Sequence, residues 1–321
     1  MASIPPGSCQ GDGTIITTTG MPTMEQPRRF DPHMEMELFS IIRSDGASGS
    51  PVVPVQLQSR DRFSFHCYQG ISCWNQCCYG ADLTLTPQCI LRLSRRLNLR
   101  PQGFLAQYTV PAFLERAELP VAKLKMGGES GKGACPFVTA EGCRVYADRP
   151  VTCRYYPLGF ATVKLKESES KEDFYFPVRE THCRGHEESR EQTVATFRRE
   201  QGVECYDHVN RGWLDIIMKA VSWKTLGGPY GKEMTAQAQK MFFMVSTDVD
   251  ALRRFIFNTN FLNTYEVSHE AIEAITNDDA TLLQLGFDWL KNVLFNEKTI
   301  VMKQHVLQTA IAKARERTGA S

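Results

Sequence analysis

"CYQGISCWNQCCYG", residues 67–80, contains four cysteines, and the last two, Cys77 and Cys78, are adjacent. Closely spaced thiols of this kind bind metals, form disulfides or fill a hydrophobic core. A cysteine that is used for packing usually sits in a periodic apolar sequence, and this segment shows no such period. Metal binding is therefore the favoured interpretation, disulfide or redox use comes second, and core packing comes last.

A second group of cysteines lies in residues 133–183, among short β-like runs that are separated by turn-forming residues. Within it, "GACPFVTAEGCRVYADRPVTCRYYPLG" places Cys143 and Cys153 on either side of the turn Asp148-Arg149-Pro150. Turns between ligands allow a chain to wrap around a soft metal, for which thiolate is the preferred ligand. The predicted metal ligands are Cys67, Cys73, Cys77, Cys78, Cys135, Cys143, Cys153 and Cys183. Three further cysteines, Cys9, Cys89 and Cys205, lie outside both groups and are not predicted to bind metal.

The adjacent pair limits how these ligands can be used. If the chain is extended there, neighbouring side chains point in opposite directions, so Cys77 and Cys78 would not reach the same ion easily. We therefore expect the two thiols to bind different metals or different irons of one cluster, or one of them to bind metal while the other packs in the core. Eight thiols suffice for two four-thiolate sites or for one cluster with spare ligands.

Nearby cations favour the metal interpretation. Arg144, Arg149 and Arg154 alternate with Cys143 and Cys153, and they would offset the excess negative charge of a thiolate centre. The alternative is that these arginines face water. His182 and His186 flank the last ligand, but histidines near a helix start are more often surface residues than ligands.

Composition excludes several classes of partner. The chain has 321 residues, 42% of them hydrophobic, which is enough for one large core or two modest ones. A formal net charge of +1 gives no field that would attract nucleic acid or an anionic membrane. The N-terminus has no secretory signal pattern, and no apolar run is long enough to span a bilayer. We therefore expect a cytoplasmic protein with no nucleic-acid or membrane partner, and we expect its partner to be another protein.

The pattern along the chain predicts an α+β fold. Residues 1–50 are predicted to be a loosely ordered leader, residues 51–222 a loop-rich cysteine-cluster domain with short strands, and residues 223–321 a mainly α-helical region. The clearest helix signal is Thr86 as N-cap, followed by Pro87 and closed by Pro101. Further helices are predicted over 189–202, 248–262, 278–295 and 299–317.

The cysteine array is similar to a known family. The thiols that end in the Cys77-Cys78 pair, the "GACPF" run and "CRVYADRPVTCRYYPLG" resemble the YkgJ-type cysteine-cluster family, a zinc- or iron-chelating domain that includes the flagellin lysine N-methylase FliB. The resemblance covers about residues 63–222. The family usually spaces its first two cysteines by two residues, whereas five separate Cys67 from Cys73 here.

This resemblance implies a metal-binding function and leaves the reaction open. An iron-sulfur cluster or iron is the expected cofactor, with zinc as the alternative, because both accept four cysteine thiolates. The centre would support redox or protein-modification chemistry. The alternatives are a non-catalytic structural zinc module for protein interaction, or a FliB-like protein lysine N-methylase. The sequence has no G-x-S-x-G, H-E-x-x-H or dinucleotide-type glycine motif, so it assigns no catalytic residue.

Overall fold

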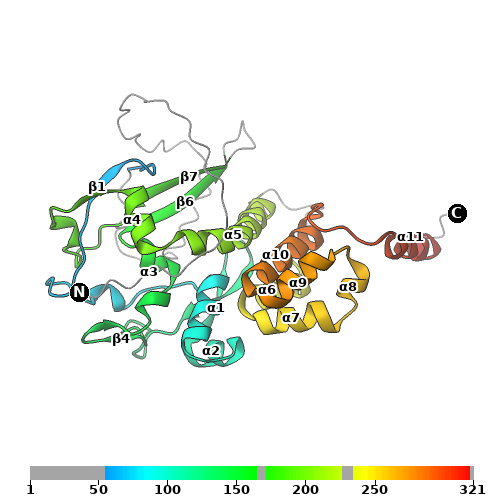
Figure 1. Ribbon diagram of the computed structural model, residues 1–321, viewed down its shortest axis with the longest axis horizontal. Coiled ribbons are helices and arrows are strands. Elements are labelled where there is room, and N and C mark those ends of the chain that lie inside the picture. The colour runs from blue at the N-terminus through cyan, green and yellow to red at the C-terminus, as the bar shows by residue number, and fades with distance from the viewer. Residues whose placement is uncertain (1–54, 165–170, 226–233, 319–321) are drawn as a thin grey trace. The chain divides into compact units, whose positions relative to one another are not determined.

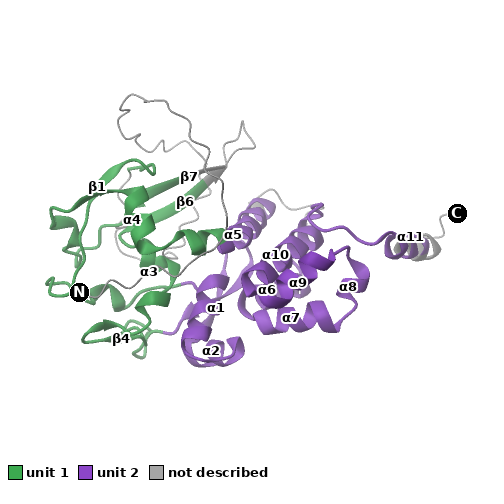
Figure 2. Ribbon diagram, in the orientation of Figure 1, with its two compact units in different colours: residues 1–83, 126–208 green, residues 84–125, 209–321 purple. Residues whose placement is uncertain are grey.

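The computed structural model describes residues 55–164, 171–225 and 234–318. The predicted leader, residues 1–50, lies outside these residues. Internal contacts divide the chain into two compact units, shown in Figure 2. Unit 1 comprises residues 1–83 and 126–208, and unit 2 comprises residues 84–125 and 209–321.

Unit 1 consists of short strands and short helices connected by turns, in agreement with the predicted loop-rich texture (Figure 1). Its strands pair antiparallel as β1 with β8, β4 with β5 and β6 with β7. The strands are β1 (Arg62–Ser64), β4 (Val138–Thr139), β5 (Gly142–Cys143), β6 (Leu158–Lys164), β7 (Lys171–Pro177) and β8 (Glu191–Thr193). The helices are α3 (Val151–Tyr155), α4 (Val194–Gln201) and the 3-10 helices η1 (Gln76–Cys78), η2 (Tyr146–Asp148) and η3 (Gly185–Glu187).

The β6–β7 hairpin provides the aromatic core of unit 1. Phe174 and Phe176 are buried with Ala161 and Val178. Gly159 lies opposite Phe176, and a Cβ there would come within 2.1 Å of the phenylalanine ring. The ring thus occupies the space that a side chain at residue 159 would need. The sequence predicted this region correctly as β-structure.

The start of α4 differs from the prediction. Helix was expected from Ser189, but Glu191–Thr193 forms β8 and pairs with β1, so that Phe63 faces Gln192 across the ladder. The helix begins only after Thr193, whose side chain accepts a hydrogen bond from the Thr196 backbone N–H. A strand partner far away in the sequence therefore displaced a local helix signal. The predicted end at Gly202 is confirmed, since this residue adopts a left-handed conformation with φ of 61°.

Unit 2 is mainly helical. It contains the antiparallel pair β2 (Thr109–Leu114) and β3 (Leu119–Leu124). Its helices are α1 (Pro87–Arg96), α2 (Pro101–Tyr108), α6 (Ala236–Thr247), α7 (Val249–Asn258), α8 (Phe261–Thr264), α9 (His269–Asn277), α10 (Asp279–Phe295) and α11 (Gln304–Thr318). Helix α5 (Glu204–Thr225) begins in unit 1 and continues into unit 2. Together the elements confirm the predicted α+β class with a helical C-terminal region.

The capping signals around α1 act as predicted, with one correction. The Thr86 side chain accepts from the Cys89 backbone N–H, and Pro87 is the first helical residue. However, α1 already ends at Arg96, and Pro101 begins α2 instead of only terminating α1. Proline fits both positions because a first-turn residue needs no backbone N–H.

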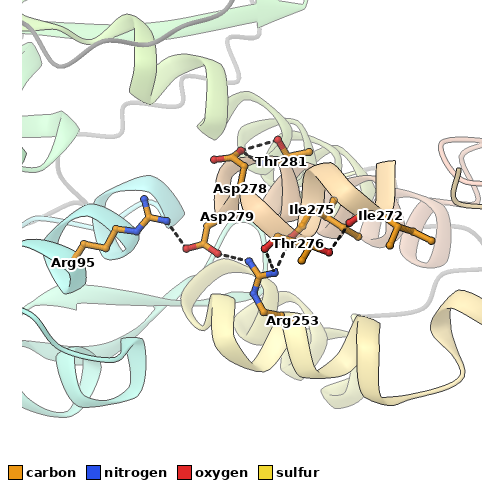
Figure 3. Close-up of polar contacts among 8 residues, drawn as sticks. All are labelled: Arg95, Arg253, Ile272, Ile275, Thr276, Asp278, Asp279 and Thr281. Carbon is orange, nitrogen blue, oxygen red and sulfur yellow. Dashed lines mark hydrogen bonds and ion pairs between the residues drawn. The ribbon is translucent and has the colours of Figure 1, made fainter. Parts of the chain in front are cut away.

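A charged network connects three parts of unit 2. Asp279, at the start of α10, contacts the Arg95 guanidinium at 2.5 Å and the Arg253 guanidinium at 2.5 Å (Figure 3). Arg253 also donates to the carbonyls of Ile275 and Thr276 at the end of α9, at 2.8 and 3.1 Å. Helices α1, α7 and α9 are thereby tied to the beginning of α10. In the described part of the chain, no helix has the length and apolar character needed to cross a bilayer.

Candidate metal centre

All eight predicted ligand cysteines lie in unit 1, and each is a free thiol. They come from the loop around η1, the segment before and within the β4–β5 hairpin, helix α3 and the turn after β7. The residues between the two cysteine groups, 84–125, belong to unit 2. The chain thus leaves unit 1 after the first four thiols and returns to it before the second four.

The first segment folds as successive turns and not as an extended strand. The Trp74 N–H donates to the Ile71 carbonyl at 2.9 Å, and the Cys78 N–H donates to the Asn75 carbonyl at 2.9 Å, which closes η1. The extended geometry assumed for Cys77 and Cys78 is therefore wrong. Consecutive side chains of a 3-10 helix are about 120° apart rather than opposite.

The two adjacent thiols contact each other as a result. The pKa of the Cys77 thiol is raised well above its usual value, first by its hydrogen bond to Cys78 and then by burial. Glu180, which the sequence did not single out, raises this pKa further. The carboxylate comes from the turn before Cys183, and no local sequence pattern predicts its approach to Cys77.

Backbone hydrogen bonds attach the first segment to the second. The Cys135 N–H donates to the Cys78 carbonyl at 2.8 Å, and the Gly80 N–H donates to the Gly133 carbonyl at 3.0 Å. The β4–β5 hairpin then pairs Val138 with Cys143. These bonds bring Cys78, Cys135 and Cys143 into one region.

The sulfur atoms of this region receive backbone N–H donors. Burial raises the pKa of Cys135, while the N–H groups of Phe137 and Val138 lower it. Burial likewise raises the pKa of Cys143, and the Val145 N–H lowers it. The Phe137 and Val145 donors each lie two residues after their cysteine. A backbone N–H aimed at sulfur stabilises the thiolate and is a usual partner of a metal-bound cysteine.

The last predicted ligand, Cys183, has the same arrangement. Its pKa is raised by burial and lowered by the Tyr156 hydroxyl and the Gly185 N–H. The following residue donates its own N–H to another sulfur, since Arg184 N lies 3.2 Å from Cys73 Sγ. The turn after β7 therefore joins Cys183 to the first cysteine segment. Tyr156 was not predicted to contribute to the site.

Cys67 and Cys153 complete the group. The pKa of Cys67 is raised to about 11, first by burial and then by the thiols of Cys77, Cys73 and Cys183. The pKa of Cys153, on α3, is also raised, first by burial and then by Cys135 and Cys77. Each of these cysteines thus lies within electrostatic range of several others.

The three arginines differ in their surroundings. Arg149 is only 8% exposed, and it lowers the pKa values of Cys67, Cys143 and Cys153. Arg144 also lowers the pKa of Cys143. Arg149 therefore provides a buried positive charge beside the thiols, as the sequence suggested.

Arg154 stabilises the loop instead. Its guanidinium donates to the carbonyls of Arg149, Ala147 and Gln201, and it covers the ring of Tyr206 at 4.7 Å. These bonds fix the turn that carries Arg149. None of these contacts is with a thiol, so they do not support the prediction that Arg154 supplies a cation to the cluster.

The histidines are engaged in other contacts. His186 Nε2 lies 3.0 Å from the Val178 carbonyl, and the ring packs edge-on against Phe65. His182 Nε2 lies 3.3 Å from a Glu180 carboxylate oxygen. Outside the cluster, Cys89 is fully buried in α1 and its sulfur accepts from the Thr86 hydroxyl at 3.1 Å. Cys9 lies outside the described residues, and Cys205 lies in the first turn of α5.

The donor set fits a thiolate-bound metal. Among the residues that the structure describes, no three cysteine, histidine or acidic side chains are already arranged to hold an ion. The chemistry of the group nevertheless suits zinc or iron, because soft sulfur donors are gathered beside backbone N–H groups and a buried arginine. Burial raises the pKa values of most of these thiols, so a metal cation would supply the charge that ionises them.

The comparisons agree with this chemistry. Residues 66–184 match a family model described as "CxxCxxCC: Putative zinc- or iron-chelating domain". This segment, which is less than half of the chain, is therefore similar to a cysteine-cluster domain. The matched range contains all eight predicted ligands of the cysteine-cluster domain, together with residues 84–125 of unit 2. No curated protein and no solved structure matches the chain.

Proposed function

We propose that this chain is a metal-binding protein whose cysteine cluster holds iron, as ions or as an iron-sulfur cluster, or zinc. The observation that carries the proposal is the set of backbone N–H groups directed at sulfur. Cys73, Cys135, Cys143 and Cys183 each accept at least one such bond. Hydrogen bonds of this kind favour thiolate over thiol and commonly accompany metal-bound cysteine.

Burial without a cation would work against these bonds. The pKa values of Cys135, Cys143 and Cys183 are raised by burial even though the N–H donors lower them. A buried thiolate therefore needs more positive charge than the chain alone supplies. Arg149 contributes part of that charge, and a bound metal ion would contribute the rest.

We further propose that the centre supports redox or modification chemistry on another protein. Iron would supply electron transfer, whereas zinc would neutralise and orient the thiolates. The chain's own residues position the centre: Arg154 fixes the turn of Arg149, and Glu180 and Tyr156 lie beside Cys77 and Cys183. Lysine N-methylation is the specific modification suggested by the resemblance to FliB. A reducing compartment such as the cytoplasm would keep these thiols available for metal.

A structural zinc module is the second candidate, and the fold of unit 1 favours it. Every sheet described there has only two strands, and α3 has five residues. Two-stranded sheets and single-turn helices are marginally stable by themselves, so metal cross-links between the four cysteine segments would add to the stability that the aromatic core provides. In this case the module would organise a surface for another protein without catalysis.

Anaerobic purification distinguishes the two candidates. Iron, acid-labile sulfide and visible absorption would support the redox or modification function. Colourless protein with stoichiometric zinc that survives aerobic handling would support the structural module. If neither metal co-purifies, and neither can be loaded into the reduced apo chain, the metal-binding proposal is wrong.

A further inference from the structure

Trp74 is a large aromatic residue inside the first group of cysteines, where it directly follows Cys73. Its backbone N–H donates to the Ile71 carbonyl at 2.9 Å, which fixes the turn that leads into η1. Its side chain is partly buried. A ring of this size inside a tight turn packs against another segment, and that segment identifies its surroundings.

The indole ring of Trp74 lies against the β4–β5 hairpin. Gly142, the first residue of β5, directly precedes Cys143, and a Cβ at Gly142 would come within 3.1 Å of Trp74 Cζ2 and 3.9 Å of Cε2. Gly142 also has φ of 128°, which side-chain-bearing residues rarely adopt. The missing side chain thus admits the ring. Because Nε1 is bonded to Cε2, the indole N–H belongs to the part of the ring nearest this backbone.

Hydrogen bonds fix the contact between the turn and the hairpin. The Asn75 side-chain amide donates to the Thr139 carbonyl at 2.9 Å. Thr139 pairs with Gly142 across the hairpin, and its hydroxyl donates to the Gly142 carbonyl at 3.0 Å. The first cysteine segment and the hairpin are therefore joined through two consecutive residues, Trp74 and Asn75. This places the indole between the backbones that carry two predicted ligands.

The indole N–H of Trp74 is a buried donor with no acceptor. Its Nε1 has no hydrogen-bond partner among the residues that the structure describes. In unit 2, by contrast, Trp213 Nε1 donates to Ser246 Oγ at 3.1 Å, and Trp289 Nε1 donates to the Tyr265 hydroxyl at 3.3 Å. Burial of a donor without an acceptor costs free energy and is rare in folded proteins. The position of Trp74 therefore indicates an acceptor that the apo chain does not supply.

We propose that the Trp74 indole N–H donates a hydrogen bond to a sulfur atom of the loaded metal centre. A thiol is a weak acceptor, whereas a metal-bound thiolate keeps negative charge and accepts N–H donors. Cys73 adjoins Trp74 in the chain, and Cys143 adjoins Gly142, so both predicted ligands lie next to the indole. The indole nitrogen is a donor only, so it supports the ligands and does not bind the metal itself. The inference rests on the proposed metal-binding function.

Trp223 provides the matched control. Its Nε1 is also buried and has no hydrogen-bond partner in the described part of the chain, but its ring packs edge-on against Phe295 at 5.4 Å. Trp223 belongs to unit 2, which contains none of the predicted metal ligands. Replacement by phenylalanine keeps an aromatic ring at either position and removes the N–H. Only the change at Trp74 should therefore affect the metal.

The first test uses nuclear magnetic resonance on the full chain, reduced, stripped of metal, labelled with nitrogen-15 and then loaded with cadmium-113. The chain has four tryptophans, so it gives four indole N–H signals, which the Trp→Phe variants assign. We expect the Trp74 indole proton to move downfield and to show a scalar coupling to cadmium-113 that is transmitted through the N–H···S hydrogen bond. The other three indole protons should show no coupling. A ring that only packs against the hairpin can change its chemical shift on loading, but it cannot couple to the metal.

The second test is zinc affinity, measured by competition with a chelator. Trp74→Phe should bind zinc about tenfold more weakly than the unmutated chain, which is the usual cost of losing a supporting hydrogen bond around a metal ligand, and Trp223→Phe should bind it equally well. Absence of coupling in the cadmium-saturated chain, or equal zinc affinities of the two variants, would overturn the role of Trp74 while leaving metal binding intact. Failure of the unmutated chain to bind zinc or cadmium would instead reject the proposed function, and this inference with it.

Discussion

Loading the apo chain with zinc at pH 7 should release at least about six protons per chain, because binding must ionise thiols that burial keeps protonated. The thiols with a raised pKa are Cys67, Cys77, Cys135, Cys143, Cys153 and Cys183. With a pKa of about 11, Cys67 is ionised at pH 7 to only about one part in ten thousand. Nearly every thiolate formed by one of these residues therefore corresponds to one released proton.

The same linkage fixes the sign and size of the pH dependence. Because the apo thiols hold their protons through the neutral range, the apparent affinity rises with pH and falls as pH is lowered. An ion held by four thiolates that were all protonated should lose about four orders of magnitude in affinity from pH 8 to pH 7. A site held by one thiolate and water molecules would lose about one.

Zinc titration in weakly buffered solution, with base added to hold the pH constant, measures the protons directly. The chain with all its thiols alkylated provides the control and should release almost none. Release of two protons or fewer per chain at saturation would show that most of the thiols are already ionised in the apo chain, and would refute the link drawn here between burial and thiol protonation.

Further outcomes follow from particular contacts. Removing metal with a chelator should abolish hydrogen-exchange protection in the unit 1 residues 63–83, 126–164 and 171–190 while α6 to α10 of unit 2 keep theirs, and unchanged exchange after complete metal removal would contradict a structural role for the centre. The Asp207 carboxylate accepts from the Tyr155 hydroxyl at 2.6 Å and from the Arg198 guanidinium at 2.7 Å. Asp207→Ala leaves both donors without their acceptor and should lower the free energy of unfolding of unit 1 by about 3 kcal/mol in chemical denaturation. A loss below about 1 kcal/mol would show that water replaces the carboxylate. Gly159→Ala should lower the free energy of unfolding by about 1–3 kcal/mol, because its Cβ meets the Phe176 ring. Gly103→Ala is the control: it lies in α2, its Cβ meets nothing within 4 Å, and it should be neutral or stabilising. Equal effects of the two changes would reject the steric argument.

The parts of the fold that could be predicted are those set by neighbouring residues. Thr86 and Pro87 determine the start of α1 because the cap is completed three residues away, at Cys89. Gly202 ends α4 for an equally local reason. The start of α4 was mispredicted because β8 pairs with β1, more than a hundred residues earlier, and no local pattern carries that information.

The same distinction applies to the site. Spacing and composition identified the cysteines, and the turn that carries Arg149 was visible in the sequence. The approach of Glu180 to Cys77, and of the Arg184 N–H to Cys73, depends on how separate segments meet. The conformation of the adjacent pair was also mispredicted, because extended chain was assumed where Asn75, with φ of 66°, begins a 3-10 turn.

The surroundings of the sulfur, rather than burial alone, separate a core cysteine from a ligand cysteine in this chain. Cys89 is fully buried on an apolar helix face, and its sulfur meets a neutral hydroxyl from its own helix cap. Cys135 and Cys143 are partly buried, and each sulfur meets backbone N–H groups that favour a negative charge. A hydroxyl contact stabilises a neutral thiol in a core without ionising it, whereas N–H donors reduce the free energy of forming a thiolate but do not offset its burial. A thiolate at Cys135 or Cys143 is therefore stable only when a cation binds beside it. This is the physical reason for assigning metal binding to the cluster and packing to Cys89.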